Sequence, residues 1–308
     1  MHVALIGYGE VGRILAEDLR ADGHQVTAFD LKLRSASAVP MRAHALVHGV
    51  KLAESHAGAV RESELTVSAV TASQTVAAAQ ACTSALPAGG FFLDFNSASP
   101  AAKMVAAEQV ERGGGRYVEG AVMTSVRPYR LRVPLLLGGP HAQQLLPVLN
   151  QLGFSARVAS SQLGVASATK MCRSVIIKGL EAMVIESFTA ARRYGVEDAL
   201  ISSLSETFPG IAWEREASYF FKRVIEHGRR RAEEMREAVV AVREAGLDPW
   251  SAAATAERQA WMADLADAGV FGKRVRVSGG KRRGRAHVLD WRIYADRILH
   301  RLTGPKEA

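Results

Sequence analysis

Three closely spaced glycines follow the first apolar run of the chain and constrain its fold more than any other feature. The run Val3–Ile6 predicts a β-strand, and a helix is predicted over Glu10–Arg20. Glycines at such a junction allow a tight turn, close approach of a ligand to the backbone and close packing of helix on strand. A helix N-terminus there also favours an anion such as pyrophosphate. The alternative is a glycine turn without a ligand. The predicted dinucleotide-binding residues are Gly7, Tyr8, Gly9, Glu10, Val11 and Gly12.

Short apolar runs alternate with helical segments over the first half of the chain, which is typical of an α/β domain with a mainly parallel sheet. Helices are clearest over 72–86 and 100–112. We therefore expect a Rossmann-type domain over residues 1–160. Its later strands are predicted at Val26–Phe29, Leu65–Val70, Phe91–Phe95, Tyr117–Val122 and Val133–Leu137.

Beyond about residue 160 the pattern becomes helical. Residues 163–194 contain no proline and predict one long helix, and no convincing strand follows it. Asp248-Pro249 predicts an N-cap and first helical position for a helix that runs to about Ala266. Gly269–Gly284 predicts a loop, and the apolar spacing from Arg285 to Leu302 predicts an amphipathic helix. Residues 161–308 are thus expected to hold a long interdomain helix and an all-helical domain with a basic C-terminal extension.

The net positive charge of the chain lies in its C-terminal segment, because the charges of the remaining residues cancel. The 308 residues carry a formal net charge of +8, and residues 273–308, with 11 Lys/Arg and 3 Asp/Glu, account for all of it. A neutral body with a basic helix at its end favours a solvated surface over nucleic-acid binding. We expect a small-molecule substrate and no nucleic-acid partner.

Cysteine content and hydropathy favour the cytoplasm. The two cysteines, Cys82 and Cys172, cannot form a disulfide framework and suit a reducing compartment, and we expect Cys172 to be packed. No apolar run approaches the roughly 18 residues of a membrane span, and the N-terminus lacks the charged region of a signal peptide. We therefore expect a cytoplasmic protein that does not bind a membrane.

An acidic residue ends the second predicted strand. Asp30 can accept hydrogen bonds from the adenosine ribose hydroxyls and would repel a 2′-phosphate, which favours NAD over NADP. Lys32 and Arg34 lie close by in the sequence and are interpreted as solvated loop charges, although they could offset that repulsion.

Four segments together resemble the β-hydroxyacid dehydrogenase superfamily, which includes 3-hydroxyisobutyrate and 6-phosphogluconate dehydrogenases. Ile6–Gly12 resembles the N-terminal fingerprint, and Asp94-Phe95-Asn96-Ser97-Ala98-Ser99-Pro100 resembles a segment that lies by the nicotinamide. Tyr117–Ser125 stands where the family has its substrate segment. Gly164 followed by Lys170 fits the family's motif on the interdomain helix. The resemblance implies the Rossmann-type fold, a nicotinamide cofactor and Lys170 as the general acid/base.

Two of these segments depart from the common pattern. Lys170-Met171-Cys172-Arg173-Ser174 lacks two asparagines of the family motif, and Met123-Thr124-Ser125 lacks its serine and glycines. The run from Lys170 to Glu181, and also His227–Met235, is similar to a phosphogluconate-dehydrogenase-like branch with a distinct helical C-terminal domain. These departures affect the inference of the substrate, not that of the fold.

A lysine at position 170 makes chemical sense in such an enzyme. Hydride transfer to a carbonyl leaves an alkoxide that a general acid must protonate. Burial or a cationic neighbour would lower the lysine pKa from its usual value of about 10.4. Helical spacing places Arg173, Ser174 and Glu181 on one broad face with Lys170. Arg173 would bind a carboxylate or phosphate of the substrate, and its alternative is a structural pair with Glu181.

Several further residues are candidates for the site. Asn96 either lies by the nicotinamide carboxamide or caps a turn, and Thr71 either lines the cofactor site or caps a helix. Met123, Thr124 and Ser125 are candidates for contact with the substrate, with the two hydroxyls as hydrogen-bond donors. We find no His/Asp/Glu group with metal-ligand spacing and predict no metal.

These features predict an NAD(P)-dependent oxidoreductase acting on a CH–OH group of a small hydroxy acid or on its carbonyl partner. One alternative is an imine reductase of similar architecture, against which Lys170 and Asp30 both argue. The other is a sensor or scaffold that binds NAD(P) without turnover. Apolar stripes at 247–265 and 285–302 leave surface to bury, so we expect a homodimer.

Overall fold

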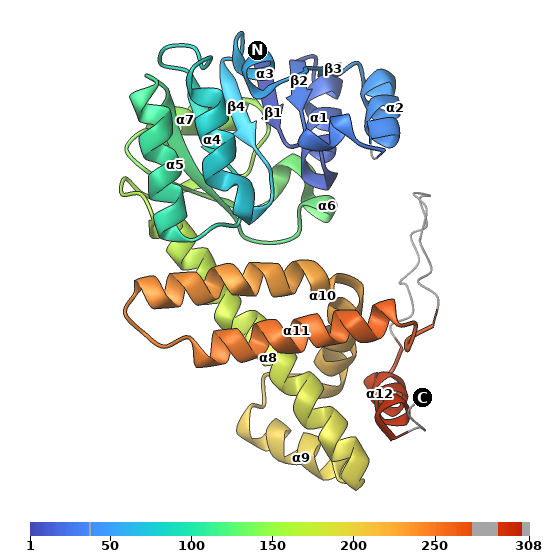
Figure 1. The fold of residues 1–308 in the computed structure, drawn as a ribbon. Helices are drawn as coiled ribbons and strands as arrows, with labels where there is room; N and C mark the ends of the chain where they lie inside the picture. Colours follow the sequence, from blue (N-terminus) through green and yellow to red (C-terminus); the bar gives the residue numbers. More distant parts are fainter. Residues whose placement is uncertain (37, 273–288, 304–308) are drawn as a thin grey trace. The chain divides into compact units, whose positions relative to one another are not determined.

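The chain divides into two compact units, Met1–Cys172 and Arg173–Ala308, as seen in a computed structural model that describes residues 1–36, 38–272 and 289–303 (Figure 1). The division falls within one long helix. Most of the predicted loop Gly269–Gly284, and residues 285–288 of the predicted C-terminal helix, lie outside the described residues.

The first unit is built on a single sheet, which has eight strands over the described residues. They lie in the order β3-β2-β1-β4-β5-β6-β7-β8, and each neighbouring pair is parallel except β6 with β7. The chain order reverses between β1 and β4, and doubly wound sheets bind ligands at the carboxyl ends of the strands at such a point. The strands are β1 (His2–Ile6), β2 (Gln25–Phe29), β3 (Lys51–Leu52), β4 (Leu65–Ser68), β5 (Phe91–Asp94), β6 (Arg116–Val122), β7 (Leu135–Gly138) and β8 (Ala156–Ser160).

Helices connect these strands, and α4 and α5 pack against each other beside the sheet (Figure 1). The helices of the first unit are α1 (Glu10–Ala21), α2 (Ala38–His48), α3 (His56–Val60), α4 (Thr75–Thr83), α5 (Pro100–Arg112), α6 (Val126–Tyr129) and α7 (Ala142–Gln151), with short 3-10 turns at Leu31–Arg34, Ala72–Gln74 and Arg130–Arg132.

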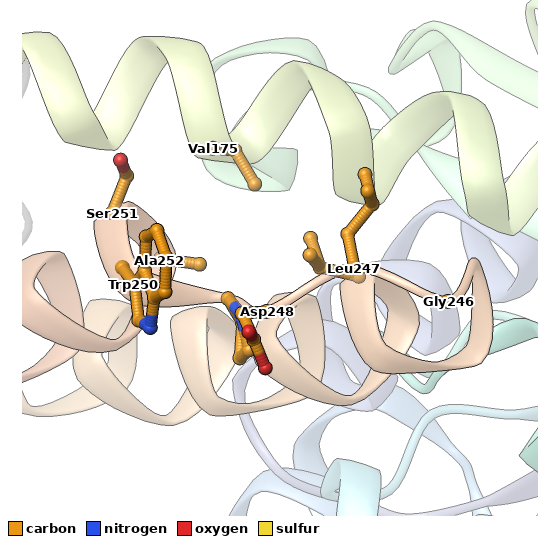
Figure 2. A pocket seen from close by; sticks show the side chains of 9 residues that line it. Val175, Gly246, Leu247, Asp248, Trp250, Ser251 and Ala252 are labelled. Atoms are coloured by element: carbon orange, nitrogen blue, oxygen red, sulfur yellow. The ribbon is translucent and has the colours of Figure 1, made fainter.

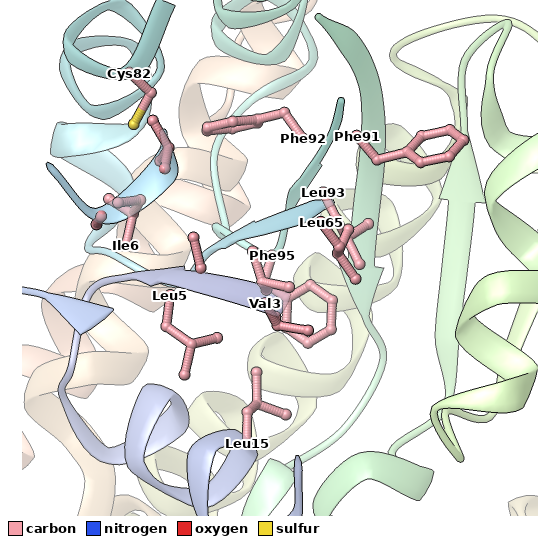
Figure 3. Packing of buried hydrophobic residues seen from close by; sticks show 14 of the residues in the cluster. Val3, Leu5, Ile6, Leu15, Leu65, Cys82, Phe91, Phe92, Leu93 and Phe95 are labelled. Carbon is pink, nitrogen blue, oxygen red and sulfur yellow. The ribbon is translucent and has the colours of Figure 1, made fainter. Parts of the chain in front are cut away.

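The core of the first unit explains why its central strands are continuous apolar runs. Val3 and Leu5 of β1 are fully buried, as is Leu15 of α1, and the apolar side chains of β4 and β5 pack close by (Figure 3). A parallel strand covered on both faces needs apolar residues at consecutive positions, not alternate ones. Each fully buried leucine contributes about 1.5–3 kcal/mol.

The second unit is helical, with no strand among its described residues. Its helices are α8 (Val165–Tyr194), which begins in the first unit, α9 (Glu197–Thr207), α10 (Trp213–Glu244), α11 (Trp250–Asp267) and α12 (Trp291–Thr303). The long helices α10 and α11 lie side by side (Figure 1).

A glycine allows α10 and α11 to pack closely. A Cβ atom on Gly228 would lie 2.7 Å from the backbone oxygen of Gln259 on α11. The buried residues of α10 recur every three or four positions, which turns one face of a highly charged helix towards the core. Trp291 at the start of α12 is also fully buried, with its ring centroid 5.0 Å from that of Phe188.

The predicted fold class is confirmed, since a Rossmann-type α/β unit precedes a helical one. The predicted long helix 163–194 is α8, and the prediction for 100–112 matches α5. Strands β3 and β8 were not predicted, and α10 lies in the region predicted as helical but without predicted bounds of its own. Pro249, predicted at the first helical position of α11, lies one position earlier, at the N-cap.

Candidate functional site

The three glycines after β1 have three separate structural roles. Gly7 has φ +98°, and a Cβ there would collide with the backbone oxygen of Ala69 at the end of β4. A Cβ on Gly12 would collide with the oxygen of Gly7, so Gly12 lets α1 pack against the loop. Around Gly9, by contrast, a Cβ would meet no atom within 4 Å. Gly7 and Gly12 are thus needed by the fold, whereas Gly9 leaves space for a ligand to approach the backbone.

The loop ends at the N-terminus of α1, where Gly9 is the N-cap and provides no side chain to cap the helix. Backbone N–H groups in the first turn of a helix have no partner within the helix, and the helix dipole adds a partial positive charge. The arrangement fits the pyrophosphate of a dinucleotide.

Asp30 lies directly after β2 and is bonded to the glycine loop. Its Oδ2 accepts a hydrogen bond from the Tyr8 amide at 2.8 Å, and its Oδ1 accepts one from the Lys32 amide at 2.8 Å. An ionised carboxylate has about four acceptor sites, so two remain for ribose hydroxyls. The guanidinium of Arg34 donates to the backbone oxygen of Glu54 at 3.1 Å.

Asn96 ties together the segments that follow β4 and β5. Its Oδ1 accepts from the Val70 amide at 2.7 Å, and its Nδ2 donates to Ser68 Oγ at 3.0 Å. The side chain is 3% exposed. Thr71 is exposed and occupies the N-cap of the turn Ala72–Gln74 without a side-chain capping bond. The cofactor contacts of Asn96 and Thr71 stay predictions.

Lys170 reaches the segment that follows β5. Its Nζ donates a hydrogen bond to Ser97 Oγ at 2.6 Å, across 73 residues of sequence. Both side chains are half-buried and belong to the first unit. The structure therefore brings the lysine to the segment expected beside the nicotinamide. Ser97 was part of the quoted motif but was not singled out by the sequence reading.

A buried carboxylate holds the start of the helix that carries Lys170. Glu119 on β6 is fully buried, and its two carboxylate oxygens accept from the backbone amides of Gly164 and Ser167. A carboxylate at a helix N-terminus satisfies N–H groups there and also opposes the helix dipole. Nothing in the sequence indicated this pairing, because Glu119 stood in the segment assigned to substrate.

A second buried group anchors the end of β5. Asp94 forms an ion pair with Lys103 at 2.9 Å and accepts from Tyr117 Oη at 2.7 Å, and all three side chains are buried. Burial, followed by the charge of Asp94, raises the pKa of Tyr117 well above its usual value, so its hydroxyl stays a donor. Asp94 therefore positions the loop that contains Ser97.

The predicted substrate residues after β6 lie in a short connection. The Met123 amide donates to the backbone oxygen of Pro134 at 2.9 Å. Thr124 is exposed, and Ser125 is half-buried at the N-cap of α6. Substrate contact by Met123, Thr124 and Ser125 stays a prediction.

In the second unit, Arg173 is exposed, whereas Ser174 and Glu181 are buried. Ser174 Oγ accepts from Lys178 Nζ at 3.1 Å, and Glu181 forms a buried ion pair with Arg231. Burial lowers the pKa of Lys178, while the carboxylate of Glu234 acts in the opposite direction. The substrate roles of Arg173 and Ser174 stay predictions.

Two details of the sequence reading are wrong. Cys172 is exposed, because it falls on an outer face of α8 and not on a packed one. The statement that no group has metal-ligand spacing is also wrong: His44 and His48 are four residues apart on α2, and Glu17 of α1 joins them. The histidine spacing was visible in the sequence, whereas the contribution of α1 was not.

A pocket of about 600 Å³ lies within the second unit, where the turn between α10 and α11 faces α8 (Figure 2). It includes none of the predicted site residues. Its lining residues are Val175, Val242, Gly246, Leu247, Asp248, Pro249, Trp250, Ser251 and Ala252.

Comparison with known families matches both parts of the chain. The model of the NAD binding domain of 6-phosphogluconate dehydrogenase matches residues 2–159. A domain of unknown function, DUF1932, matches residues 191–262. The predicted resemblance, including a distinct helical C-terminal domain, is confirmed.

Three similar proteins are described as hypothetical, of unknown function or uncharacterized. A conserved hypothetical protein from Sinorhizobium meliloti 1021 is 33% identical, with a TM-score of 0.77, over 98% of this chain and 96% of that one. The conserved protein MTH1747 of unknown function is described as structurally similar to 3-hydroxyacid dehydrogenases. It is 30% identical, with a TM-score of 0.70, over 87% of this chain and 98% of that one. An uncharacterized 28.5 kDa protein of Methanothermus fervidus is 26% identical over 241 residues, which cover 77% of this chain and 89% of that protein.

More distant structures share the fold alone. Mycobacterium tuberculosis 3-hydroxyisobutyrate dehydrogenase is 17% identical, with a TM-score of 0.67, over 96% of this chain and 98% of that one. A Streptomyces aurantiacus imine reductase is 18% identical, with a TM-score of 0.56, over 88% of this chain and 95% of that one. Over the residues that the structure describes, no helix combines the length and apolarity needed to cross a membrane.

Proposed function

Because the chain belongs to the family that carries the NAD binding domain of 6-phosphogluconate dehydrogenase, we propose that it is a nicotinamide-dependent oxidoreductase acting on a small hydroxy acid or its carbonyl partner. The hydrogen bond of 2.6 Å between Lys170 and Ser97 carries this proposal. This bond places the amino group of Lys170, which can transfer a proton, at the edge of the sheet where we propose that a dinucleotide binds.

A continuous set of contacts connects this lysine with the glycine loop. Gly7 packs against Ala69, and the next residue, Val70, donates its amide proton to Asn96. Ser97 follows Asn96 in the chain and accepts from Lys170. All these residues lie in the first unit: Lys170 is on α8, and the others are on the loops that follow β1, β4 and β5. A nicotinamide held by these loops would lie within reach of the lysine.

The residues that would hold the cofactor follow from the loop geometry. The open backbone at Gly9 and the N-terminus of α1 suit the pyrophosphate, and Asp30 suits the ribose hydroxyls. A 2′-phosphate would meet a carboxylate already fixed by Tyr8, so NAD is preferred over NADP in this proposal.

Lys170 would move the proton of the reacting oxygen. When bound, the nicotinamide supplies or accepts a hydride. Protonated Lys170 donates a proton from Nζ to the developing alkoxide, and in the reverse direction neutral Lys170 accepts the hydroxyl proton. Ser97 fixes the position of Nζ through its Oγ. A positioned acid/base of this kind contributes about 10²–10⁴-fold to the rate.

Sequence features alone support the acidic character of the substrate. Arg173 follows Lys170 on α8 by three residues, and a guanidinium suits a carboxylate or phosphate. Thr124 and Ser125 add hydroxyl donors in the segment that resembles the family's substrate segment. We propose an acid group on the substrate from these residue types alone.

The experiment is a screen of small 3-hydroxy acids with NAD and with NADP, read as NAD(P)H absorbance. Activity on one of them in the wild type, lost about 10²-fold or more in Lys170→Met with cofactor binding unchanged, supports the proposal. Lys222→Met is the matched control, because this lysine is half-buried, as Lys170 is, but lies on α10 in the second unit. Turnover that survives in Lys170→Met contradicts the assignment. Reduction of cyclic imines with a preference for NADPH would favour an imine reductase.

A further inference from the structure

Two histidines of α2 and a glutamate of α1 converge in the first unit, and these two helices pack together (Figure 1). His44 and His48 lie one helical turn apart on α2, with ring centroids 4.4 Å apart. Glu17 projects from α1, and its Oε1 lies 2.9 Å from His44 Nε2. One ligand atom from each of the three side chains lies within 4.8 Å of those of the other two.

The atoms of Glu17 and His44 that face away from this cluster are already held by neighbours. His44 Nδ1 is 2.8 Å from Tyr8 Oη, and Arg130 donates to Glu17 Oε2 at 2.7 Å. In metal sites, a ligating histidine nearly always donates its second ring N–H to an outer partner, which fixes the ring orientation. Tyr8 and Arg130 occupy such outer positions here.

The local charge suits a cation. Arg130 is shared between Glu17 and Asp18, at 2.7 Å and 2.6 Å, so its single positive charge is set against two carboxylates. All three ligand side chains are half-buried.

We propose that Glu17, His44 and His48 bind one divalent transition cation of the zinc type. Two imidazoles and one carboxylate form a three-ligand set that suits Zn²⁺ and leaves the fourth position to water. Ligand atoms at about 2.1 Å from one cation lie roughly 3 to 3.5 Å apart, close to the observed separation of His44 Nε2 and Glu17 Oε1. The cation would take the place of the hydrogen bond between these two atoms, and His44 would bind it as a neutral imidazole whose single proton lies on Nδ1.

This site would be linked to the glycine loop through one side chain. Tyr8 lies between Gly7 and Gly9, and its amide donates to Asp30. In the metal-bound form, His44 Nδ1–H donates to Tyr8 Oη, so the cation fixes the side chain of a loop residue. Metal binding itself needs neither the dinucleotide nor a substrate.

The test is calorimetric titration of the full-length, tag-free chain with ZnCl₂ after removal of metals by EDTA. We expect one Zn²⁺ per chain, and Co²⁺ in its place should give the visible absorption of a site with nitrogen and oxygen ligands. Glu17→Gln and His48→Gln, which change different helices, should each weaken binding by about tenfold or more. Tyr8→Phe should weaken it by about 10–100-fold, as loss of an outer partner does.

The matched control is His227→Gln, which removes a half-exposed histidine of the second unit and should leave the affinity within about twofold. Thermal unfolding of each metal-free variant establishes that it is folded. Zn²⁺ should raise the melting temperature of the wild type and of His227→Gln, but not that of His48→Gln. Absence of stoichiometric binding, or unchanged affinity in folded His48→Gln, would overturn the proposal.

Discussion

The carboxylate of Glu119 accepts a hydrogen bond from the backbone amide of Gly164, 45 residues further along the chain. Through this bond and a second one to Ser167, β6 fixes the first turn of α8. Lys170 follows on the same helix and reaches Ser97. The position of the proposed acid/base thus depends on a buried carboxylate that itself takes no part in the chemistry.

Replacing this carboxylate should destabilise the first unit. In Glu119→Gln an amide NH₂ group would face one of the two backbone amides, and a buried donor without an acceptor costs about 1–3 kcal/mol. The free energy of unfolding, measured with urea, should fall by that amount. The control is Glu108→Gln, which removes an exposed pair with Arg112 and should cost no more than about 0.5 kcal/mol. Equal stability of the two variants would contradict the buried role of Glu119.

Replacing Gly12 or Gly9 with alanine should have different effects: the first should lower the stability of the fold, and the second should lower the affinity for NADH. Gly12→Ala places a Cβ against the oxygen of Gly7, and we expect a loss of about 1–3 kcal/mol in unfolding free energy. Gly9→Ala places its Cβ in open space, so stability should be nearly unchanged while NADH affinity falls about tenfold or more. Gly210→Ala, also in open space but far along the chain, is the control. Full NADH affinity in Gly9→Ala would contradict the placement of the pyrophosphate.

The two cysteines should differ in reactivity. Burial raises the pKa of the Cys82 thiol to about 12, whereas Cys172 is exposed. Since the thiolate is the reactive form, a thiol reagent at pH 8 should modify one cysteine per native chain and both in urea. Cys172→Ser should abolish native labelling. Labelling of Cys82 in that folded variant would contradict its burial.

The same shift predicts a dependence of stability on pH. The folded-state pKa of Cys82 lies above its ordinary value of 9.0, so the native chain retains this proton when the unfolded chain has lost it. The buried thiol makes its full contribution to the free energy of unfolding below pH 9. This contribution falls by about 1.4 kcal/mol per pH unit as the pH rises towards 12. The free energy of unfolding of Cys82→Ala should lack this fall between pH 9 and pH 12. Parallel pH profiles for wild type and variant would contradict the shift.

The expected homodimer can be tested at an exposed apolar edge of the second unit. Leu247 and Trp250, at the turn between α10 and α11, are 66% and 80% exposed. Large exposed apolar groups of this kind often mark protein interfaces. If this edge lies in the dimer interface, Trp250→Glu should convert a dimer into a monomer in size-exclusion chromatography with light scattering. A monomeric wild type would contradict the expectation, as would a variant that remains dimeric.

Local patterns in the sequence were sufficient for β1, the glycine loop and α1. The conformation of these elements is determined by residues that are close together in the sequence. Gly7 and Gly12 are required there because their positions leave no room for a larger side chain. By contrast, β8 is an edge strand whose sequence, Ala156–Ser160, alternates in exposure and forms no apolar run. Helix α10 lies in the region predicted as helical, but its bounds were not predicted because its many charged residues obscure a buried face.

Contacts between distant segments were beyond the sequence reading unless a family resemblance indicated them. The resemblance brought Lys170 and the segment containing Ser97 into one hypothesis, and the structure places them 2.6 Å apart. It did not indicate the cap at Glu119 or the approach of Glu17 to His44 and His48. These pairs join separate elements, and a single sequence contains no signal for the packing that brings them together.

Calorimetric titration of the wild-type chain with NADH and with NADPH tests whether the glycine loop binds the cofactor that a nicotinamide-dependent oxidoreductase needs. One NADH should bind per chain, and NADPH should bind more weakly because its 2′-phosphate would meet Asp30. Tighter binding of NADPH would contradict the role of Asp30. Failure to bind either nucleotide would contradict the proposed function as a whole.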